Sequence, residues 1–431
     1  MEFRKVFLNY LQTMFKALKL SIESLIFALQ AVVVNRLRTI LSLLGITIGI
    51  FAIISVFTIV DSLEMNIRES LSSLGSDIVY VQKWPWTEES GGEFKWWQYV
   101  NRPVPNIQEY EQLRSRLTKA EAIAFVVSTG TNVKFKENQI ENINFMGVTS
   151  GFETIRNFDI QQGRYFTDYE LISGKNIAVI GHEIARKLFN NIDPINQTIT
   201  IRGHKTRVVG IMTKEGKDSF GDTMDEVIIV PVNHVRNVVN IRSESMNPMI
   251  WVKALPNVEL EELLGELRVN LRSIRRLKPN ASDNFALNQT SMLNNQLDQF
   301  FGTLNIAGWV IGIFSLLVGG FGIANIMFVS VKERTRQIGI QKALGAKRYF
   351  ILEQFVFESI LLAVMGGAVG LFLVFLGTVI INQATDFTIA LTAGNIILGI
   401  SISSAIGLLS GLAPAYSGAA LDPVNAMNST F

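Results

Sequence analysis

The stretch TLNIAGWVIGIFSLLVGGFGIANIMFVSV, residues 303–331, contains no Asp, Glu, Lys or Arg. About 20 apolar residues of α-helix cross a hydrocarbon core roughly 30 Å thick, so this stretch is long enough to span a bilayer. The same four residue types are missing from residues 39–60, 359–385 and 387–421. Helices of a soluble core average only about 11 or 12 residues. The sequence therefore predicts four transmembrane helices, at residues 39–60, 303–331, 349–380 and 393–416.

The composition of the whole chain agrees with a membrane protein. Of its 431 residues, 48% are hydrophobic and 18% are charged, whereas about 25% of the residues of an ordinary soluble domain are charged. The net charge of +2 gives no field of one sign that would attract nucleic acid. The absence of cysteine excludes disulfides, thiol catalysis and Cys-based zinc sites. We therefore expect a membrane partner and no nucleic-acid partner.

The distribution of Lys and Arg predicts the orientation. Basic residues mark the cytoplasmic flanks of transmembrane helices. They occur before the first span and in the loop after the second, at Arg4, Lys5, Lys16, Lys19, Arg36, Arg38, Lys332, Arg334, Arg336, Lys342, Lys347 and Arg348. All other Lys and Arg lie within residues 61–302. We therefore place residues 332–348 in the cytoplasm and residues 61–302 outside it, with the tail at 417–431 returning to the cytoplasm by parity.

Residues 1–38 form an N-terminal segment with a different pattern. Apolar residues recur at helical spacing, at Leu11, Phe15, Leu18, Ile22, Leu25, Leu29 and Val32. Charged residues at positions 16, 19 and 23 lie between them, which is typical of an amphipathic helix in the membrane interface. A cleaved signal peptide is the alternative, but it requires an uninterrupted apolar core that these charges break.

Residues 61–302 show the pattern of an α+β domain on two helical stalks that continue the first and second spans. Candidate strands are residues 78–81, 123–127, 132–135, 177–180, 198–202, 206–209, 227–232 and 250–253. Candidate helices are residues 107–118, 182–190 and 258–276. Gly203-His204 is predicted to form a tight hairpin turn with glycine first. Residues 145–240 form an inserted subdomain in one interpretation of this pattern. The expected fold is thus a four-helix membrane protein with a large α+β extracytoplasmic domain inserted between helices 1 and 2.

The sequence shows no constellation of catalytic or metal-binding residues. His182-Glu183 begins an HExxH-like string, but position 186 is Arg, so the second zinc ligand is missing. No GxSxG nucleophile elbow and no calcium-loop pattern occur. We therefore expect no catalytic, cofactor-binding or metal-binding residue on this chain.

Each predicted span carries two glycines four residues apart. The pairs are Gly45 and Gly49, Gly308 and Gly312, Gly366 and Gly370, and Gly407 and Gly411. Small residues at this spacing let helix backbones approach closely in lipid. Each single pair is explained equally well by the general frequency of glycine in membrane helices, but their presence in all four spans favours an assembled bundle and a dimer.

Four tryptophans lie close together after the first stalk, at Trp84, Trp86, Trp96 and Trp97. Such residues contact a hydrophobic substrate, a partner or the lipid interface in many proteins. The alternative is that they cover the core of their own domain.

The segment VKERTRQIGIQKALGAKR, residues 331–348, is the most informative motif. Glu333 precedes a short predicted helix and Lys342 lies in its last turn, each at the end that the helix dipole favours. Gly345 is placed to end that helix in the left-handed conformation. A loop that only sets topology would explain the basic residues but not the apolar residues and glycines between them.

This segment resembles the ERTREIGIRMAVGA signature of the MacB-type, FtsX-like permeases of the ABC superfamily. Residues 35–39, 73–77, 411–415 and 420–423 are similar to further parts of that family, and residues 163–166, 178–181 and 193–199 are similar to its periplasmic core. The resemblance covers nearly the whole chain and implies a multi-pass protein of the bacterial inner membrane with its large domain in the periplasm.

The resemblance also implies partners. Members act as dimers, either of one permease or of two related ones, and their coupling loops dock onto a dimer of ABC ATPases. This sequence has no GxxxxGK[ST] loop, so ATP, Mg²⁺ and hydrolysis would belong to a separate subunit. The implied function is mechanotransmission to the periplasmic domain for efflux or export, with an adaptor and an outer-membrane channel, or for lipoprotein release. The alternative is a regulatory scaffold that activates a cell-wall hydrolase.

The resemblance assigns the ATPase-coupling role to residues 333–346. Polar contacts are expected from Glu333, Arg334, Arg336 and Lys342. Ile338, Ile340 and Leu344 are expected to fill a groove on the ATPase. Gly339 and Gly345 are expected to permit close approach.

Overall fold

The structure of the chain is a computed structural model. It describes residues 36–72, 75–88, 94–190, 192–215, 224–385 and 388–427, with side chains from residue 43 onward. Of the predicted interfacial segment at residues 1–38, residues 1–35 lie outside the described residues, and residues 36–38 begin α2. The chain divides into two compact units, residues 1–64 with 300–431 and residues 65–299. We call them the helical unit and the sheet domain.

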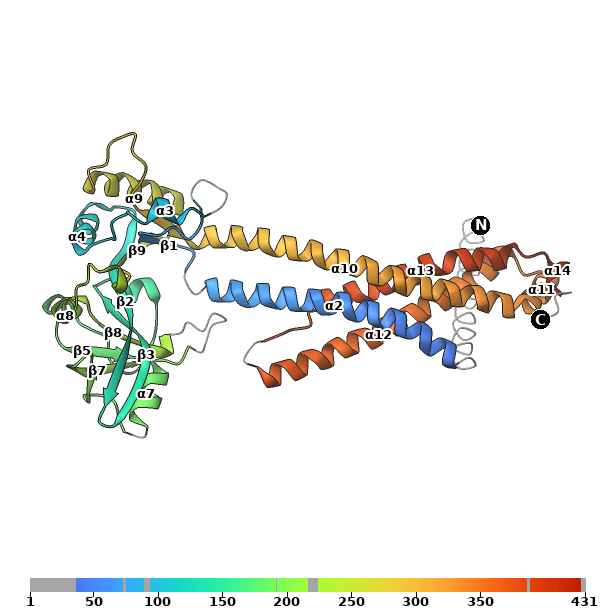
Figure 1. Ribbon diagram of the computed structural model, residues 1–431, viewed down its shortest axis with the longest axis horizontal. Helices are drawn as coiled ribbons and strands as arrows, with labels where there is room; N and C mark the ends of the chain where they lie inside the picture. Colours follow the sequence, from blue (N-terminus) through green and yellow to red (C-terminus); the bar gives the residue numbers. More distant parts are fainter. Residues whose placement is uncertain are drawn as a thin grey trace, which may run out of the picture. The chain divides into compact units, whose positions relative to one another are not determined.

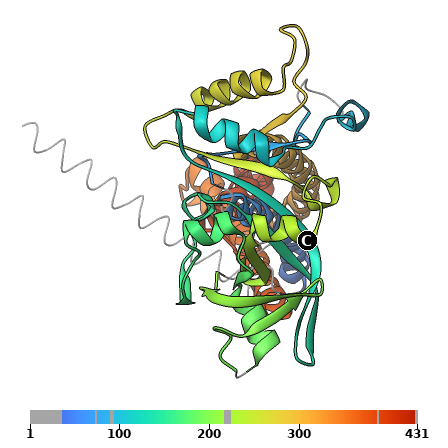
Figure 2. The same ribbon diagram turned by 90° about the vertical axis from the view of Figure 1, so that its left-hand side faces the viewer.

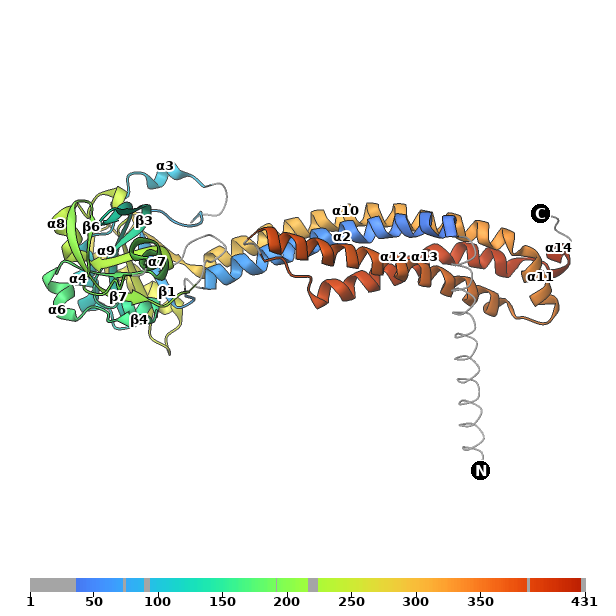
Figure 3. The same ribbon diagram turned by 90° about the horizontal axis from the view of Figure 1, so that it is seen from below.

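Long helices dominate the helical unit (Figure 1). They are α2 (Arg36–Ser72), α10 (Thr290–Glu333), α11 (Thr335–Ala343), α12 (Arg348–Ala384), α13 (Ala393–Ala420) and α14 (Pro423–Met427). The helices α2, α10, α12 and α13 are each long and apolar enough to cross a membrane. Helices α12 and α13 pack along each other, as the views in Figures 1 and 3 also show.

The predicted helical stalks are present as continuations of two long helices. Helix α2 runs beyond residue 60 to Ser72, and α10 begins at Thr290, before the charge-free stretch that starts at residue 303. The segment predicted as a tail at 417–431 contains the end of α13 and the short helix α14. Asp422 caps α14 by accepting bonds from the backbone N–H groups of Val424 (2.9 Å) and Asn425 (3.2 Å).

Glycines allow α2 to pack closely against α10. A Cβ atom at Gly49 would lie 3.1 Å from the carbonyl oxygen of Ser315, and one at Gly45 would lie 3.8 Å from the Cα of Gly319. A Cβ at Gly308 would lie 3.2 Å from Val56, and one at Gly312 would overlap the side chain of Ile53.

The other glycine pairs pack α12 against α2 and α13 against α12. A Cβ at Gly370 would lie 3.0 Å from the carbonyl oxygen of Thr47, and one at Gly407 would lie 2.7 Å from the Cα of Ile360. Gly366 faces Ile46 of α2, and Gly411 faces Ser359 of α12. All these neighbours belong to the same chain. The glycine pairs thus explain the close packing of the helices within one copy, and the expected dimer stays a prediction.

The sheet domain contains one mixed sheet of the ten strands found among the described residues. They are β1 (Ile78–Gln82), β2 (Ala120–Phe135), β3 (Asn138–Val148), β4 (Ile160–Gly163), β5 (Ile177–Ile180), β6 (Thr198–Ile201), β7 (His204–Met212), β8 (Val227–Pro231), β9 (Met249–Ala254) and β10 (Ala286–Gln289). Their order is β10-β1-β9-β2-β3-β8-β5-β7-β4, and β6 pairs with β2 and β7.

Short helices surround this sheet. They are α3 (Trp96–Tyr99), α4 (Ile107–Arg116), α5 (Phe152–Arg156), α6 (Asp168–Ser173), α7 (His182–Phe189), α8 (Val232–Val238) and α9 (Leu260–Ile274), with the 3₁₀ turns η1 (Met224–Glu226) and η2 (Glu244–Met246). Helices α4 and α9 lie side by side (Figure 2). The sheet is buried on both faces: Val79 and Val81 belong to one apolar core, and Ile78 and Tyr80 to the other, because successive side chains of a strand point to opposite faces.

The sequence pattern predicted fewer and shorter strands than the structure contains. Residues 123–127 and 132–135 are parts of one long strand, β2, with a register shift between Thr131 and Val133. Strands β3, β4 and β10 were missed, because their sequences carry several polar residues and lack a clear alternation. Segment 145–240 is not a separate sheet, since β3 pairs in parallel with β8 and joins both halves.

The hairpin between β6 and β7 turns one residue earlier than predicted. Ile201 pairs with His204, so Arg202 and Gly203 form the turn. Both have positive φ angles, 49° and 86°, as a type I′ turn requires. His204 is therefore the first residue of β7 rather than part of the turn.

Glu170 of α6 is held by hydrogen bonds within the sheet domain, and these bonds lead us to expect a loss of stability in acid. Its carboxylate accepts two hydrogen bonds from Arg164, at 2.7 and 2.8 Å, and one from the backbone N–H of Thr167 at 3.1 Å. These bonds, chiefly those from Arg164, lower the pKa of Glu170 from 4.5 to about 2. A depressed folded-state pKa stabilises the fold above pH 4.5, and this stabilisation is lost as the pH falls toward 2.

We expect Glu170→Gln to lower the free energy of unfolding at pH 7 by about 1 to 3 kcal/mol, the lower value allowing for solvent screening at Arg164. The difference from the parent chain should shrink between pH 4.5 and pH 2. Thermal unfolding of the full chain as a function of pH measures it. Glu111→Gln, at an exposed position of α4, serves as the control. A Glu170→Gln difference that stays constant with pH would contradict the assignment.

Candidate functional site

The segment between α10 and α12 is a separate short helix with defined ends (Figure 1). Helix α10 ends at Glu333, and Arg334 interrupts it with φ −97° and ψ 9°. Helix α11 then begins at Thr335, whose hydroxyl donates a hydrogen bond to the carbonyl of Val331 at 3.1 Å. The break at Arg334 separates α11 from α10 as an element of its own.

Gly345 ends α11 as the sequence predicted. Its φ is +100°, a conformation that glycine adopts without strain. The backbone N–H of Gly345 donates to the carbonyl of Lys342, and the N–H of Ala346 donates to that of Gln341, each at 3.0 Å. These two bonds form a Schellman motif, which fixes the direction in which the chain leaves α11.

One side of α11 is buried within the chain itself. The side chain of Ile338 is 2% exposed, and a Cβ atom on Gly339 would lie 3.0 Å from the side chain of Ala426 in α14. These two residues hold α11 against α14 and the neighbouring helices. They do not belong to the exposed surface of the segment, so the groove-filling and close-approach roles expected for them do not fit their positions.

Lys342 connects α11 to the end of α13. Its Nζ atom donates hydrogen bonds to the carbonyl oxygens of Ala419 at 2.6 Å and Leu421 at 2.5 Å. Burial lowers the pKa of this amine below its ordinary value; the positive charge of Arg348 acts in the same direction, and Asp422 opposes it. The last carbonyl groups of a helix lack partners within the helix, so Lys342 acts as a cap for α13.

Arg334 connects the break in the helix to α12. Its Nη1 atom lies 3.2 Å from Oε2 of Glu358 in an ion pair whose acidic side chain is buried. Glu358 was not among the predicted site residues, although it is the last charge before the apolar part of α12. That acidic residue next to a charge-free stretch was the available signal.

The opposite side of α11 presents apolar side chains to the surroundings. Leu344 is 85% exposed and Ile340 is 46% exposed. Glu333, Arg336 and Gly345 are exposed as well. An exposed leucine on an anchored helix, with charged residues beside it, is typical of the centre of a protein interface. We call Glu333, Arg336, Ile340, Leu344 and Gly345 the exposed α11 surface.

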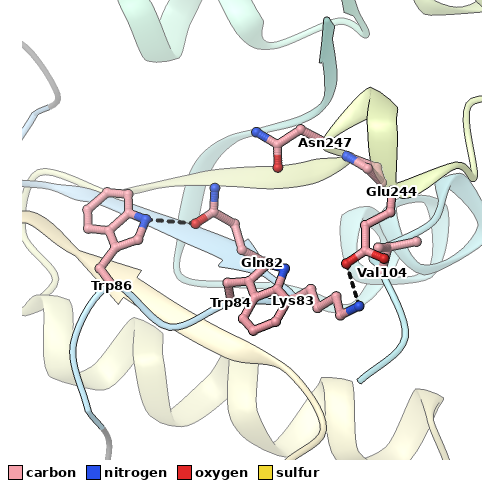
Figure 4. Close-up of a pocket in the computed structure, with 8 residues that line it drawn as sticks. Gln82, Lys83, Trp84, Trp86, Val104, Glu244 and Asn247 are labelled. Carbon is pink, nitrogen blue, oxygen red and sulfur yellow. Dashed lines mark hydrogen bonds and ion pairs between the residues drawn. The ribbon is translucent and has the colours of Figure 1, made fainter. Parts of the chain in front are cut away.

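Trp84 and Trp86 lie beside a pocket in the sheet domain (Figure 4). Its volume is about 210 Å³, and it is lined by Gln82, Lys83, Trp84, Trp86, Val104, Glu244, Asn247 and Pro248. The indole N–H of Trp86 donates to Oε1 of Gln82 at 2.8 Å, and Lys83 forms an ion pair with Glu244. The ring of Trp86 also packs on Tyr80, with centroids 5.1 Å apart. These contacts give Trp86 a structural role in its own domain, and Trp84 lines the pocket beside it.

Trp96 and Trp97 differ from the other pair because both are exposed. Each is 57% accessible, and their rings meet edge to face with centroids 6.0 Å apart. They lie on α3, which Tyr99 anchors by burying its ring and donating a hydrogen bond to Glu88 at 2.7 Å. Of the four tryptophans, this pair has the side chains available for a partner.

The part of the chain that the structure describes contains no group of three His, Cys, Asp or Glu residues that could hold a metal ion. The Nδ1 atom of His182, the first residue of the HExxH-like string, lies 2.9 Å from Oε1 of Gln161. His234 is buried, and its Nε2 atom lies 3.4 Å from the hydroxyl of Thr206. Neither arrangement suggests catalysis.

Two families match the chain. Residues 39–269 match the MacB-like periplasmic core domain, and residues 309–423 match the FtsX-like permease C-terminal domain. The second match contains α11 and its contacts with α12, α13 and α14.

Curated relatives match over almost the whole chain. The macrolide export ATP-binding/permease protein MacB of Neisseria gonorrhoeae is 28% identical over 412 residues, which cover 94% of this chain and 61% of the relative. This chain thus spans less than two thirds of the length of that relative. The ABC transporter permease YknZ of Bacillus subtilis is 29% identical over 416 residues, which cover 94% of this chain and 98% of the relative.

Among solved structures, the periplasmic region of MacB from Actinobacillus actinomycetemcomitans aligns with a TM-score of 0.43 and 15% identity, covering 53% of this chain and 96% of that region. The family matches together cover residues 39–269 and 309–423, and the segment around α11 lies in the permease part. The chain belongs to the family of MacB-like, FtsX-like permeases of ABC transporters.

Proposed function

We propose that this chain is the permease subunit of an ABC transporter and that a separate ATPase binds the exposed α11 surface. The observation that carries this proposal is Leu344, a leucine that is 85% exposed on a helix whose other side is anchored. Burying such a side chain in a partner's groove contributes about 1.5 to 3 kcal/mol, and Arg336 and Glu333 supply polar contacts around it.

The anchoring of α11 supports a mechanical role. Gly339 packs on α14, Lys342 binds the end of α13, and Arg334 pairs with Glu358 of α12. A displacement of α11 by a partner would therefore move several helices together. We infer that ATP and Mg²⁺ bind to the partner subunit and that this chain transmits the motion of the partner to the sheet domain.

The basic residues of the α11 segment favour a cytoplasmic position for it, which would place the sheet domain, inserted between the first and second spans, in the periplasm and the helices in the inner membrane. We propose export or efflux, or release of lipoproteins, as the process driven. A second permease copy or a related chain, a periplasmic adaptor and an outer-membrane channel are the further partners we propose. The exposed Trp96 and Trp97 supply a surface for one of those partners.

The test is the retention of candidate ABC ATPases by the full chain after co-expression. We expect Leu344→Asp to weaken retention about tenfold to a hundredfold, because the leucine contribution of about 1.5 to 3 kcal/mol is lost. ATP turnover of the complex should fall in parallel.

Two variants serve as controls. Leu344→Met keeps an apolar side chain and should retain the ATPase. Val269→Asp makes the same apolar-to-acidic change at an exposed position of α9 and should retain it as well. Equal retention by Leu344→Asp and the parent chain would refute the proposed interface.

A further inference from the structure

Hydrogen bonds attach helix α13 to other helices at both of its ends. We call these two sets of hydrogen bonds the ties of α13. At its C-terminal end, Lys342 of α11 donates hydrogen bonds to the carbonyl oxygens of Ala419 (2.6 Å) and Leu421 (2.5 Å). The carbonyl groups at a helix end have no partner within the helix, and Lys342 supplies one for two of them. The position of α11 and that of the C-terminal end of α13 are therefore linked.

The other end of α13 is tied to α2. The buried Asn395 donates from Nδ2 to Oδ2 of Asp61 at 3.0 Å. Next to it, the hydroxyl of Ser62 accepts a hydrogen bond from the backbone N–H of Ala390 at 3.0 Å and donates to the carbonyl of the same residue at 3.4 Å. Asp61 and Ser62 belong to α2, which continues to Ser72.

Between these ties, α13 is a continuous helix of 28 residues, which at 1.5 Å per residue is about 42 Å long. It contains Pro414 without a break. Gly407 lies so close to α12 that a Cβ atom would be 2.7 Å from the Cα of Ile360, and a Cβ at Gly399 would lie 3.4 Å from Ile54 of α2. Close packing along its length limits bending of α13.

We propose that α13 transmits the movement of α11 to α2. Helices α2 and α10 would then both move together with α11. Helix α10 is connected to α11 directly through Arg334, whereas α2 has no such direct connection to α11. The route through Lys342, α13 and the Asn395–Asp61 pair connects them by hydrogen bonds and reaches α2 at Asp61. The ATP-driven part of this inference rests on the proposed function, but the mechanical link between the two ties does not.

The link is tested first without an ATPase, by a double-mutant cycle on the full chain in lipid nanodiscs. Lys342→Met and Asn395→Val each remove one tie, and thermal unfolding is measured for both single variants and the double variant. Distant, independent sites have additive effects, whereas coupled sites do not. We expect the double variant to lose clearly less in Tm than the sum of the single losses, because the second tie has little effect once the first is cut. Additive losses would overturn the proposal.

Asn382→Val provides the matched control for this cycle. Asn382 lies on α12 and holds the same loop, accepting from the N–H of Ile389 at 2.8 Å and donating to its carbonyl at 2.9 Å. It is not part of α13, so its effect should add to that of Lys342→Met. Non-additivity of the same size in this control pair would also overturn the proposal, because it would show general softening rather than transmission along α13.

The second arm uses the complex with the co-purified ATPase. The chain has no cysteine, so Ile59→Cys on α2 and Ile306→Cys on α10, both exposed positions, accept spin labels without further changes. We expect the distance between the labels to be the same with and without nucleotide in the otherwise unchanged chain, because both helices follow α11. In Lys342→Met and in Asn395→Val the distance should become nucleotide-dependent, since α2 then lags behind α10.

The two arms separate the possible failures. One failure is that the distance between the labels stays independent of nucleotide in both tie variants, although nucleotide moves a spin label on Arg336→Cys. That result would overturn the inference and leave the proposed function intact. If no ATPase binds the chain, the proposed function fails, and the double-mutant cycle alone decides whether α13 links the two ties.

Discussion

Gly407→Leu is expected to disrupt the packing of α13 on α12. At this position even a Cβ atom would lie 2.7 Å from the Cα of Ile360 and 2.8 Å from the Cβ of Ala363, and real Cβ atoms do not approach a neighbouring backbone that closely. The helices must separate along this contact, because the backbone of α12 cannot rotate away as a flexible side chain can. Overpacking commonly costs about 1 to 3 kcal/mol, and lost contacts between the separated helices add to that cost.

We therefore expect the free energy of unfolding to fall by about 3 kcal/mol or more, with a lower Tm and aggregation of the full chain in detergent. Gly377→Leu on α12 is the matched control, since a Cβ atom there meets no described atom within 4 Å. Replacing glycine inside a helix stabilises it by about 0.5 to 1 kcal/mol where space allows. A similar loss of stability in both variants would show that the close contact at Gly407 is not the cause.

Arg334→Ala is expected to be the most damaging single change in the α11 segment. It leaves the buried carboxylate of Glu358 without the guanidinium that lies 3.2 Å away. Removing one partner of a buried ion pair costs about 3 to 5 kcal/mol, because an uncompensated charge stays in an apolar environment. Thermal or denaturant unfolding of the full chain measures this loss.

The double variant Arg334→Ala with Glu358→Leu should recover much of the stability, because replacing a buried pair with apolar groups is often close to neutral. Lys253→Ala supplies the comparison: it breaks an ion pair with Glu121 at 3.1 Å that is partly exposed and should cost at most about 1 kcal/mol. If the double variant is as unstable as Arg334→Ala alone, the buried charge is not the cause. Recovery of stability without recovery of ATP turnover would show that the pair also serves transmission.

The coupling residues illustrate what a sequence motif does and does not determine. The capping pattern of residues 333–346 predicted the helix, its basic last turn and the left-handed Gly345, and the structure has all three. The direction of each side chain was not predictable, because α11 is too short and too mixed in composition to show one apolar face. Ile338 and Ile340 are two residues apart, yet one is buried and the other exposed.

The tryptophans show the same limit in the sheet domain. Their proximity in sequence suggested one shared role, but Trp86 packs on Tyr80 while Trp96 and Trp97 remain exposed. The partners of Trp86 include Asn288, which accepts a hydrogen bond from its backbone N–H at 2.9 Å. A contact between residues so distant in sequence depends on the pairing of β1 with β10, and β10 had no clear signal of its own.

Local properties, namely the length of an uncharged stretch and the alternation of side chains, were sufficient to predict the four long apolar helices and the α+β character of residues 61–302. The pairing of residues across those elements is visible in the packed structure alone. These pairings are all contacts between distant segments. They join Glu358 to Arg334, Asn395 to Asp61, Lys342 to the end of α13, and the glycines to their neighbouring helices. Their energy depends on burial and geometry that exist only once the helices have packed.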